Sequence, residues 1–130
     1  MTSEKKFRLK LLGRDFGIVK LEPDRPVPDW AMMNGLWSVT RTESELTIVC
    51  PETAIPADVA YDGTWQCMRV EGTFDFETTG VIASLSVPLS QSGISIYVFS
   101  SYVTDYFLIK KKNIQHAIRV LEQQGHAFVG

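Results

Sequence analysis

The chain has 130 residues, of which 45% are hydrophobic and 22% charged, and its formal net charge is −2. This length and composition suit one folded domain or two very small ones. The small negative charge gives no bulk attraction to nucleic acid or to an anionic membrane. No run approaches the roughly 18 apolar residues of a membrane span, and the start, "MTSEKKFRLK", lacks the apolar core of a signal peptide. We therefore expect a cytoplasmic protein with neither a nucleic-acid nor a membrane partner.

The first part of the chain is rich in strand patterns. "FRLKLLG" alternates apolar and basic residues, and "RDFGIVKLE" follows after a short polar break, so residues 7–22 predict a hairpin of two strands. Three prolines fall in residues 23–35, which we expect to form a loop with one short helical turn. "LWSVTRT" and "ELTIVCP" predict a second hairpin, with Leu46, Ile48 and Cys50 on one face.

A change of pattern in the middle of the chain suggests a boundary. Residues 51–63, "PETAIPADVAYDG", have turn formers at both ends and predict one short helix around "ADVAY". We place the boundary there, which gives an N-terminal module of residues 1–62 and a C-terminal module of residues 63–130. Cys50 and Cys67 lie in apolar, strand-like runs without a CxxC partner, so we expect buried thiols and no metal site.

The second module alternates strands with two helical patterns. "TWQCMRVEG" predicts a strand, and Val81, Ile82, Leu85 and Leu89 have the spacing of one helical face. Thr78 or Thr79 is a candidate N-cap for that helix, Gly93 is a suitable stop, and Pro88 is expected to bend or shorten its last turn. "ISIYVFS" and "YFLIK" predict a hairpin, "NIQHAIRVLEQQG" a second helix and "HAFVG" a last short strand.

This order, strand–helix–strand–strand–helix–strand, is that of a ferredoxin-like α+β fold with an antiparallel sheet. Both helices then cover one face of the sheet and leave the other face open. If Ile94, Ile96 and Val98 face the helices, Tyr97 and Phe99 point to the open face. Aromatic residues on such a face favour a second layer over it, from the N-terminal half, from another subunit or from both.

Two long segments resemble a known family. Residues 70–110, "VEGTFDFETTGVIASLSVPLSQSGISIYVFSSYVTDYFLIK", and residues 38–52, "SVTRTESELTIVCPE", are similar to small bacterial ACT-domain proteins related to the CASTOR-type arginine sensors. The resemblance implies two ACT-like modules, the N-terminal one degenerate and strand-rich, with an amino acid bound where modules meet. It also implies a regulatory protein that needs no cofactor, has no catalytic function and forms a homodimer or a higher homo-oligomer.

The resemblance and the residues agree on where a free amino acid would bind. Backbone N–H groups at the start of the first helix of the second module suit a carboxylate, because they are unpaired and lie at the positive end of the helix dipole. An acid at the strand corner suits the ammonium group. The candidate ligand-binding residues are Thr79, Gly80, Val81, Ile82, Ser84, Ser101, Tyr102 and Asp105.

Each candidate residue also has a simpler explanation. Gly80 would serve equally to let a helix approach a strand closely, and Asp105 to bond its own turn. From the residues alone these explanations are preferred, and the resemblance favours ligand binding instead. Ser84 either bonds back to the Gly80 carbonyl or, as the sensor relatives imply, reaches a ligand of a neighbouring module. Ser101 and Tyr102 are otherwise ordinary corner residues. In the family, Thr is common at position 101 and Ile or Leu at position 107, where this chain has Ser101 and Phe107.

Two other functions remain open. A sheet with an aromatic open face would also suit a protein-interaction or oligomerisation module without a ligand. A small enzyme that uses Asp75 or Glu77 for acid–base catalysis is the least favoured alternative, because no orienting base or nucleophile accompanies these acids.

Overall fold

The computed structural model describes residues 6–33, 35–72 and 79–130, which form two compact units. Unit 1 consists of Met1–Gly13 and Gln66–Gly130, and unit 2 consists of Arg14–Trp65. Strands β1 (Arg8–Leu21) and β4 (Asp62–Val70) therefore each contribute residues to both units. The two compact units do not coincide with the predicted modules, residues 1–62 and 63–130, because unit 1 also contains residues 1–13. The division into two family modules therefore stays a prediction.

Unit 2 is built on a hairpin that the sequence predicted. Strands β2 (Ser38–Arg41) and β3 (Leu46–Pro51) pair antiparallel, and β3 also pairs antiparallel with the second part of β1. The polar residues between β2 and β3 close the turn, where the Thr42 N–H donates to the Glu45 carbonyl at 2.8 Å. The predicted inward face is confirmed: Leu46, Ile48 and Cys50 are buried in one apolar cluster with Val19. The short helical turn in the proline-rich loop is the 3-10 helix η1 (Asp29–Met32).

Two predictions for the first half were wrong. The expected hairpin over residues 7–22 is the single long strand β1, in which Gly13 has a φ of 75°. A glycine with positive φ lets the strand deform locally and continue, as at a bulge. The expected helix around "ADVAY" does not form either. The helical turn in residues 51–63 is the 3-10 helix η2 (Glu52–Ala54), directly after Pro51. Pro56 then starts a turn that the Val59 N–H closes.

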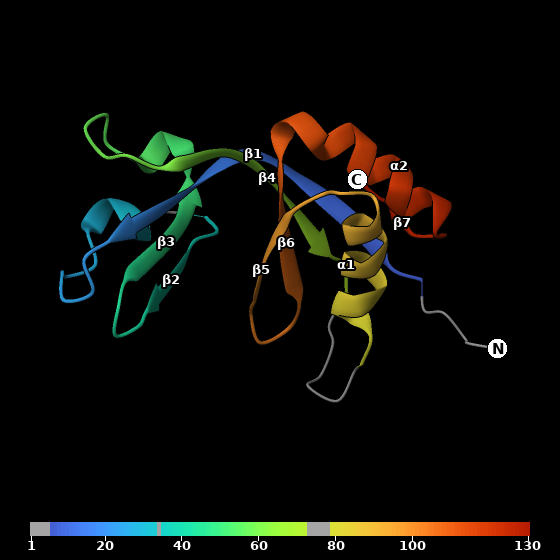
Figure 1. Cartoon of the computed structure of the whole chain (residues 1–130), viewed down its shortest axis with the longest axis horizontal. Helices are drawn as coiled ribbons and strands as arrows, with labels where there is room; N and C mark the ends of the chain where they lie inside the picture. The colour runs from blue at the N-terminus through green and yellow to red at the C-terminus, as the bar shows by residue number, and fades with distance from the viewer. Residues whose placement is uncertain (1–5, 34, 73–78) are drawn as a thin grey trace. The chain divides into compact units, whose positions relative to one another are not determined.

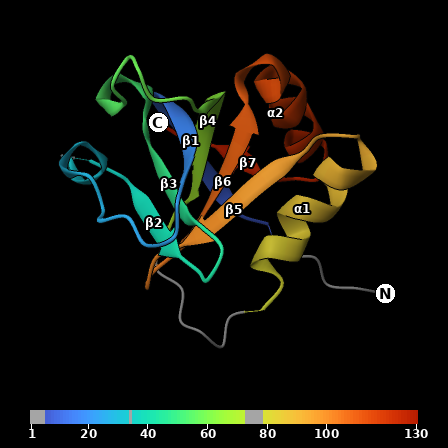
Figure 2. The same cartoon turned by 60° about the vertical axis from the view of Figure 1, so that its left-hand side comes forward.

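Unit 1 has the order of elements that the sequence predicted. After β4 come the helix α1, the hairpin of β5 and β6, the helix α2, preceded by the 3-10 turn η3, and the short strand β7. Figure 2 shows both helices on the same side of the strands of this unit. The bounds are α1 Val81–Gln91, β5 Ile96–Ser100, β6 Asp105–Lys110, η3 Lys111–Asn113, α2 Ile114–Gln123 and β7 Ala127–Phe128.

The sheet of unit 1 is not built from the strands of the predicted second module alone. β1 lies beside β4, β4 beside β6, and β6 beside β5, which is the edge strand. β7 pairs with the start of β1, and this pairing is parallel, so the sheet is not antiparallel throughout. The mixed α+β, ferredoxin-like character is confirmed for this unit, with one strand borrowed from the start of the chain.

One core fixes both helices on the sheet. It contains Leu85 and Leu89 of α1, Ala117 and Leu121 of α2, and apolar residues of β1, β4 and β6. Ile94, Ile96 and Val98 belong to or pack against this core, as their spacing predicted. In the described part of the chain, no helix is long and apolar enough to cross a membrane.

Candidate functional site

The start of α1 is open at its backbone. Gly80 is the N-cap with a φ of 81°, and as a glycine it supplies no capping side chain of its own. The N-cap is therefore Gly80 and not the predicted Thr79, and Thr78 lies outside the described residues. A Cβ placed on Gly80 would meet only the Ser84 Oγ, at 4.0 Å, among the described atoms. The left-handed backbone thus explains this glycine better than close packing against the described residues does.

The side chains that follow Gly80 have separate environments. Val81 is buried in the core of unit 1, so only its backbone N–H remains available to a ligand. Ile82 is exposed, although the sequence placed it on the buried face. Ser84 is half-buried, and its backbone N–H donates to the Gly80 carbonyl at 2.9 Å. The first turn therefore presents backbone donors, with an apolar side chain beside them.

The corner between β5 and β6 is a tight turn that closes on itself. The Ser101 N–H donates to the Thr104 carbonyl at 2.9 Å, and the Ser101 hydroxyl lies 3.4 Å from both backbone polar atoms of Thr104. Tyr102 is 78% exposed. Thr104, which sequence reasoning missed, is buried, and its hydroxyl donates to the Val70 carbonyl of β4 at 2.6 Å. This bond anchors the corner to the sheet.

Asp105 is the first residue of β6 and pairs with Ser100, the last residue of β5. Its half-buried carboxylate accepts a hydrogen bond from the Ser100 hydroxyl. By the alternation of the strand, Asp105 shares a face with Phe107 and Ile109, which belong to the helix-covered core. Figures 1 and 2 both place this corner and the start of α1 at the same end of unit 1. The fold thus brings the predicted residues to one end in two groups, each held by its own contacts.

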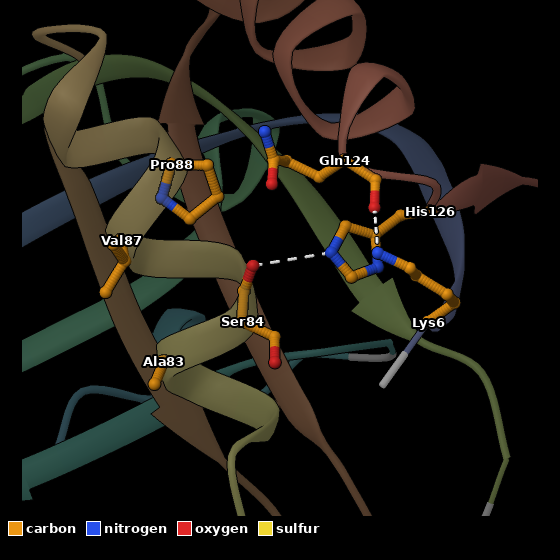
Figure 3. A pocket seen from close by; sticks show the side chains of 7 residues that line it. All are labelled: Lys6, Ala83, Ser84, Val87, Pro88, Gln124 and His126. Atoms are coloured by element: carbon orange, nitrogen blue, oxygen red, sulfur yellow. Dashed lines mark hydrogen bonds between the residues drawn. The ribbon is translucent and has the colours of Figure 1, made fainter. Parts of the chain in front are cut away.

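A pocket of about 180 Å³ lies between α1 and the end of α2, away from most of the predicted residues. In Figure 3, Ser84 and Pro88 of α1 face Gln124, His126 and Lys6. The Ser84 carbonyl points at His126, whereas its hydroxyl is directed elsewhere. The Lys6 ammonium donates to the Gln124 carbonyl at 2.5 Å. The polar groups here are engaged with one another, so we do not place the ligand in this pocket.

Sequence reasoning missed His126 as a partner of α1, and Lys6 as a partner of Gln124. One signal could have found the first of these contacts: a proline inside a helix leaves a carbonyl without its helical donor. Where metal ions are concerned, the described residues contain no cluster of three or more His, Cys, Asp or Glu side chains that could hold one. Asp75 and Glu77, the acids of the enzyme alternative, lie outside the described residues.

On the face of the unit 1 sheet opposite the helices, the predicted Phe99 contacts a second aromatic residue that the prediction did not name. Phe99 of β5 stacks on Tyr106 of β6, with ring centroids 5.2 Å apart and planes 11° from parallel. Arg69 of β4 forms an ion pair with Glu71, with the Arg69 Nε 2.6 Å from a carboxylate oxygen. That hydrogen bond lowers the pKa of Glu71 and raises that of Arg69. This face therefore combines stacked rings with a paired charge.

Comparison with protein families assigns two parts of the chain. Residues 61–123 match the model of the ACT domain. Residues 14–58 match a second model, described as an N-terminal domain. The two matched segments cover most of unit 1 and most of unit 2. The search of curated proteins gave no match.

Several solved structures share the fold. The chain is similar to an Agrobacterium tumefaciens protein, with 36% identity, a TM-score of 0.91 and coverage of 97% of this chain and 94% of that one. It is also similar to a Vibrio cholerae protein of unknown function described as a possible transport protein (18% identity, TM-score 0.76, coverage 92% and 90%). The regulatory subunit of aspartate kinase from Thermus flavus has the same fold (14% identity, TM-score 0.63, coverage 90% and 96%).

Proposed function

The chain belongs to the family of the Agrobacterium tumefaciens protein, with an ACT domain at residues 61–123, and we propose that it is a regulatory protein that binds a free amino acid. The observation that carries this proposal is the start of α1, where the N-cap is a glycine in the left-handed conformation and carries no side chain. The fold is shared with an aspartate kinase regulatory subunit, a protein whose name describes regulation in amino-acid metabolism.

The proposed site uses the two groups of residues at one end of unit 1. The ligand carboxylate accepts hydrogen bonds from the backbone N–H groups of Val81 and Ile82, where the helix dipole favours a negative charge. Gly80 leaves room for the ligand to reach them. The Asp105 carboxylate receives the ligand ammonium, with Ser101 and Tyr102 at the rim of the corner. The side-chain specificity of the site is not part of the proposal.

The proposal also covers the oligomeric state of the chain and its relationship to other proteins. We propose that unit 2 is a degenerate ACT-like module, that copies of the chain associate as a homodimer or a higher homo-oligomer, and that Ser84 reaches a ligand across the interface. Relationship to arginine sensors and a cytoplasmic location belong to the same proposal. The mechanism is a shift of population, in which the ligand bridges modules and stabilises one arrangement of them. The protein then needs no catalytic residue and no cofactor.

A thermal-shift screen against the twenty amino acids at millimolar concentration tests the proposal. A ligand that binds only the folded state at a hundredfold excess over its Kd adds about 2.7 kcal/mol of stability, which raises the Tm by about 5 to 10 °C for a chain of this size. We expect one amino acid, or one chemical class, to give such a shift. Replacing Asp105 removes a charge-assisted hydrogen bond and is expected to weaken binding at least about tenfold.

The controls separate the charge from the fold of the corner. Asp105→Asn keeps an acceptor for the Ser100 hydroxyl and removes only the charge, whereas Asp105→Ala removes both. Asp58→Asn, at an exposed acid of unit 2, is the matched control and should bind like the wild type. A flat screen, or equal binding by Asp105→Asn and the wild type, would contradict the proposal and favour an interaction module without a ligand.

A further inference from the structure

Pro88 lies inside α1, where it removes one hydrogen bond from the helix. In an α-helix the N–H of residue 88 would donate to the carbonyl of Ser84, and proline has no N–H. The helix nevertheless continues to Gln91. Residue 88 therefore supplies no donor to the Ser84 carbonyl, and a donor from another element can pair with this half-buried group.

His126 supplies that donor. Its Nε2 lies 3.3 Å from the Ser84 carbonyl oxygen (Figure 3), and the Phe7 backbone N–H donates to its Nδ1 at 3.0 Å. A neutral imidazole carries one proton. Because Nδ1 accepts a hydrogen bond, the proton is on Nε2, which donates to Ser84. The two bonds together assign both the neutral state and the tautomer of this histidine.

His126 is also fixed from two further directions. Its backbone N–H donates to the Leu121 carbonyl of α2 at 3.1 Å. Its ring stacks on that of Phe7, with centroids 5.9 Å apart and planes 15° from parallel. The side chain is only 4% exposed. The ring and backbone of His126 thus join the segment that leads into β1, Ser84 of α1 and the end of α2.

We propose that His126 positions α1 for ligand binding: in its neutral form it replaces the helical bond that Pro88 removes, and its protonation releases α1 and weakens the site at the start of that helix. The inference rests on the proposed function, because Val81, Ile82 and Ser84 belong to the same helix. His126 touches no ligand in this account. It acts through the Ser84 carbonyl, one turn after Gly80.

Protonation breaks the arrangement because it adds a second N–H. On the imidazolium, Nδ1 becomes a donor and faces the Phe7 N–H, which is also a donor. Among the described residues that line the pocket beside His126, Lys6 carries a charge of the same sign as an imidazolium, while Ser84 and Pro88 of α1 and Gln124 after α2 are uncharged. Acid therefore favours the released state, since the released imidazole can take up a proton without this conflict.

The first experiment measures the pH response of the full chain between pH 7.5 and pH 5. His126→Gln keeps a donor and cannot titrate. His116→Gln, at the exposed histidine of α2, is the matched control. In the wild type and in His116→Gln, we expect acidification to lower the Tm by several degrees more than it does in His126→Gln. The Kd of the amino acid found in the screen should also rise about fivefold to tenfold more in these two chains than in His126→Gln. An identical pH response in His126→Gln and the wild type would overturn the proposal.

The second experiment restores the missing helical bond. Pro88→Ala restores the N–H that can donate to the Ser84 carbonyl. The Tm loss caused by His126→Leu should therefore be smaller, by at least about a third, in the Pro88→Ala background than in the wild type. Such a non-additive effect is expected of two donors that share one acceptor. Strict additivity of the two substitutions would contradict the replacement of one bond by the other. If His126→Leu does not fold, the same comparison is made with His126→Asn, which is smaller and polar.

Failure of the proposed function would be visible separately. The Tm comparison and the hydrogen exchange of the Phe7 amide require no ligand. If no amino acid binds, but the protection of the Phe7 amide relative to its intrinsic exchange rate at each pH falls in acid only in chains that carry His126, the control of α1 by His126 exists and the ligand site does not. If an amino acid binds with the same pH dependence in all variants, the site exists and His126 does not control it.

Discussion

Asp105 illustrates what a single residue in a sequence can and cannot reveal. Its place at a strand corner and its acidic character were predictable, and the structure places it as the first residue of β6. Its bond with Ser100 was not part of the prediction. That bond supports the simpler explanation, in which the acid stabilises its own hairpin, and the role of Asp105 in ligand binding stays a proposal.

The residues that sequence reasoning missed act through distant partners. Thr104 bonds to Val70 and His126 bonds to Ser84, 34 and 42 residues away along the chain. Neither pair has a local pattern, because a hydroxyl or an imidazole can bond to any nearby carbonyl. Pro88 was recognised as an awkward residue inside a helix, but the sequence did not identify which donor compensates for it.

The buried thiols lead to a prediction about reactivity. Burial raises the pKa of Cys50 to about 11 and that of Cys67 to about 12, from an ordinary value of 9.0. At pH 8 both thiols therefore stay protonated in the folded chain, and a thiolate is the reactive form. We expect almost no reaction of the native protein with an aromatic disulfide reagent, and reaction of both thiols after unfolding in guanidinium.

The same shifts give the direction of an alkaline effect. Above about pH 9 the thiols of the unfolded chain ionise while those of the folded chain do not, so the stabilisation is complete below pH 9 and declines as the pH rises towards 11 to 12. The reagent assay is repeated at pH 7, 8 and 9 on the native protein. Modification of either cysteine at the rate of a free thiol would contradict burial of that side chain.

At the scale of elements, periodicity was a reliable guide wherever it was long. The two helices, the β2–β3 hairpin and the β5–β6 hairpin all have the predicted type, because their apolar residues follow one period over several turns or pairs. Glycine was a less reliable guide. Gly93 and Gly125 end helices with φ values of 75° and 95°, whereas Gly13, with a φ of 75°, lies within a strand. A glycine permits all these conformations, and tertiary packing selects among them.

The helix ends explain how the candidate site arises from the local sequence. Two threonines before α1 suggested a side-chain cap, yet Gly80 occupies the cap position. A capping side chain would have consumed backbone donors that the proposed ligand uses. Because Gly80 has no side chain to accept these donors, the cap position suits the proposed carboxylate site.

At the scale of the whole molecule, the order of elements was predictable but the sharing of strands was not. β7 pairs with Arg8 and Leu9 of β1, so the first residues of the chain complete the C-terminal unit. Pairing between residues more than 110 positions apart leaves no mark in a local pattern. A division of the chain based on changes of composition therefore assigns residues 1–13 to the first module rather than to unit 1.

The proposed oligomer leads to a prediction at this scale. Phe99 stacks on Tyr106 on the sheet face that the helices of unit 1 do not cover. If a second copy covers this face, Phe99→Asp places a charge in an apolar interface and should dissociate the oligomer. Light scattering is expected to give the mass of one chain for Phe99→Asp and an unchanged mass for Gln115→Asp, on the exposed side of α2. An unchanged mass for Phe99→Asp, with its circular dichroism intact, would contradict this interface.

The measurement that tests the central claim most directly is an NMR titration of the ¹⁵N-labelled full chain with each of the twenty amino acids. Binding at the start of α1 predicts saturable shifts of the Gly80, Val81 and Ile82 amides together with that of Asp105, with the same Kd at all four. The same shifts should vanish in Asp105→Asn. Saturable shifts confined to other parts of the chain, or no saturable shift with any amino acid, would contradict an amino-acid site at this end of the ACT domain.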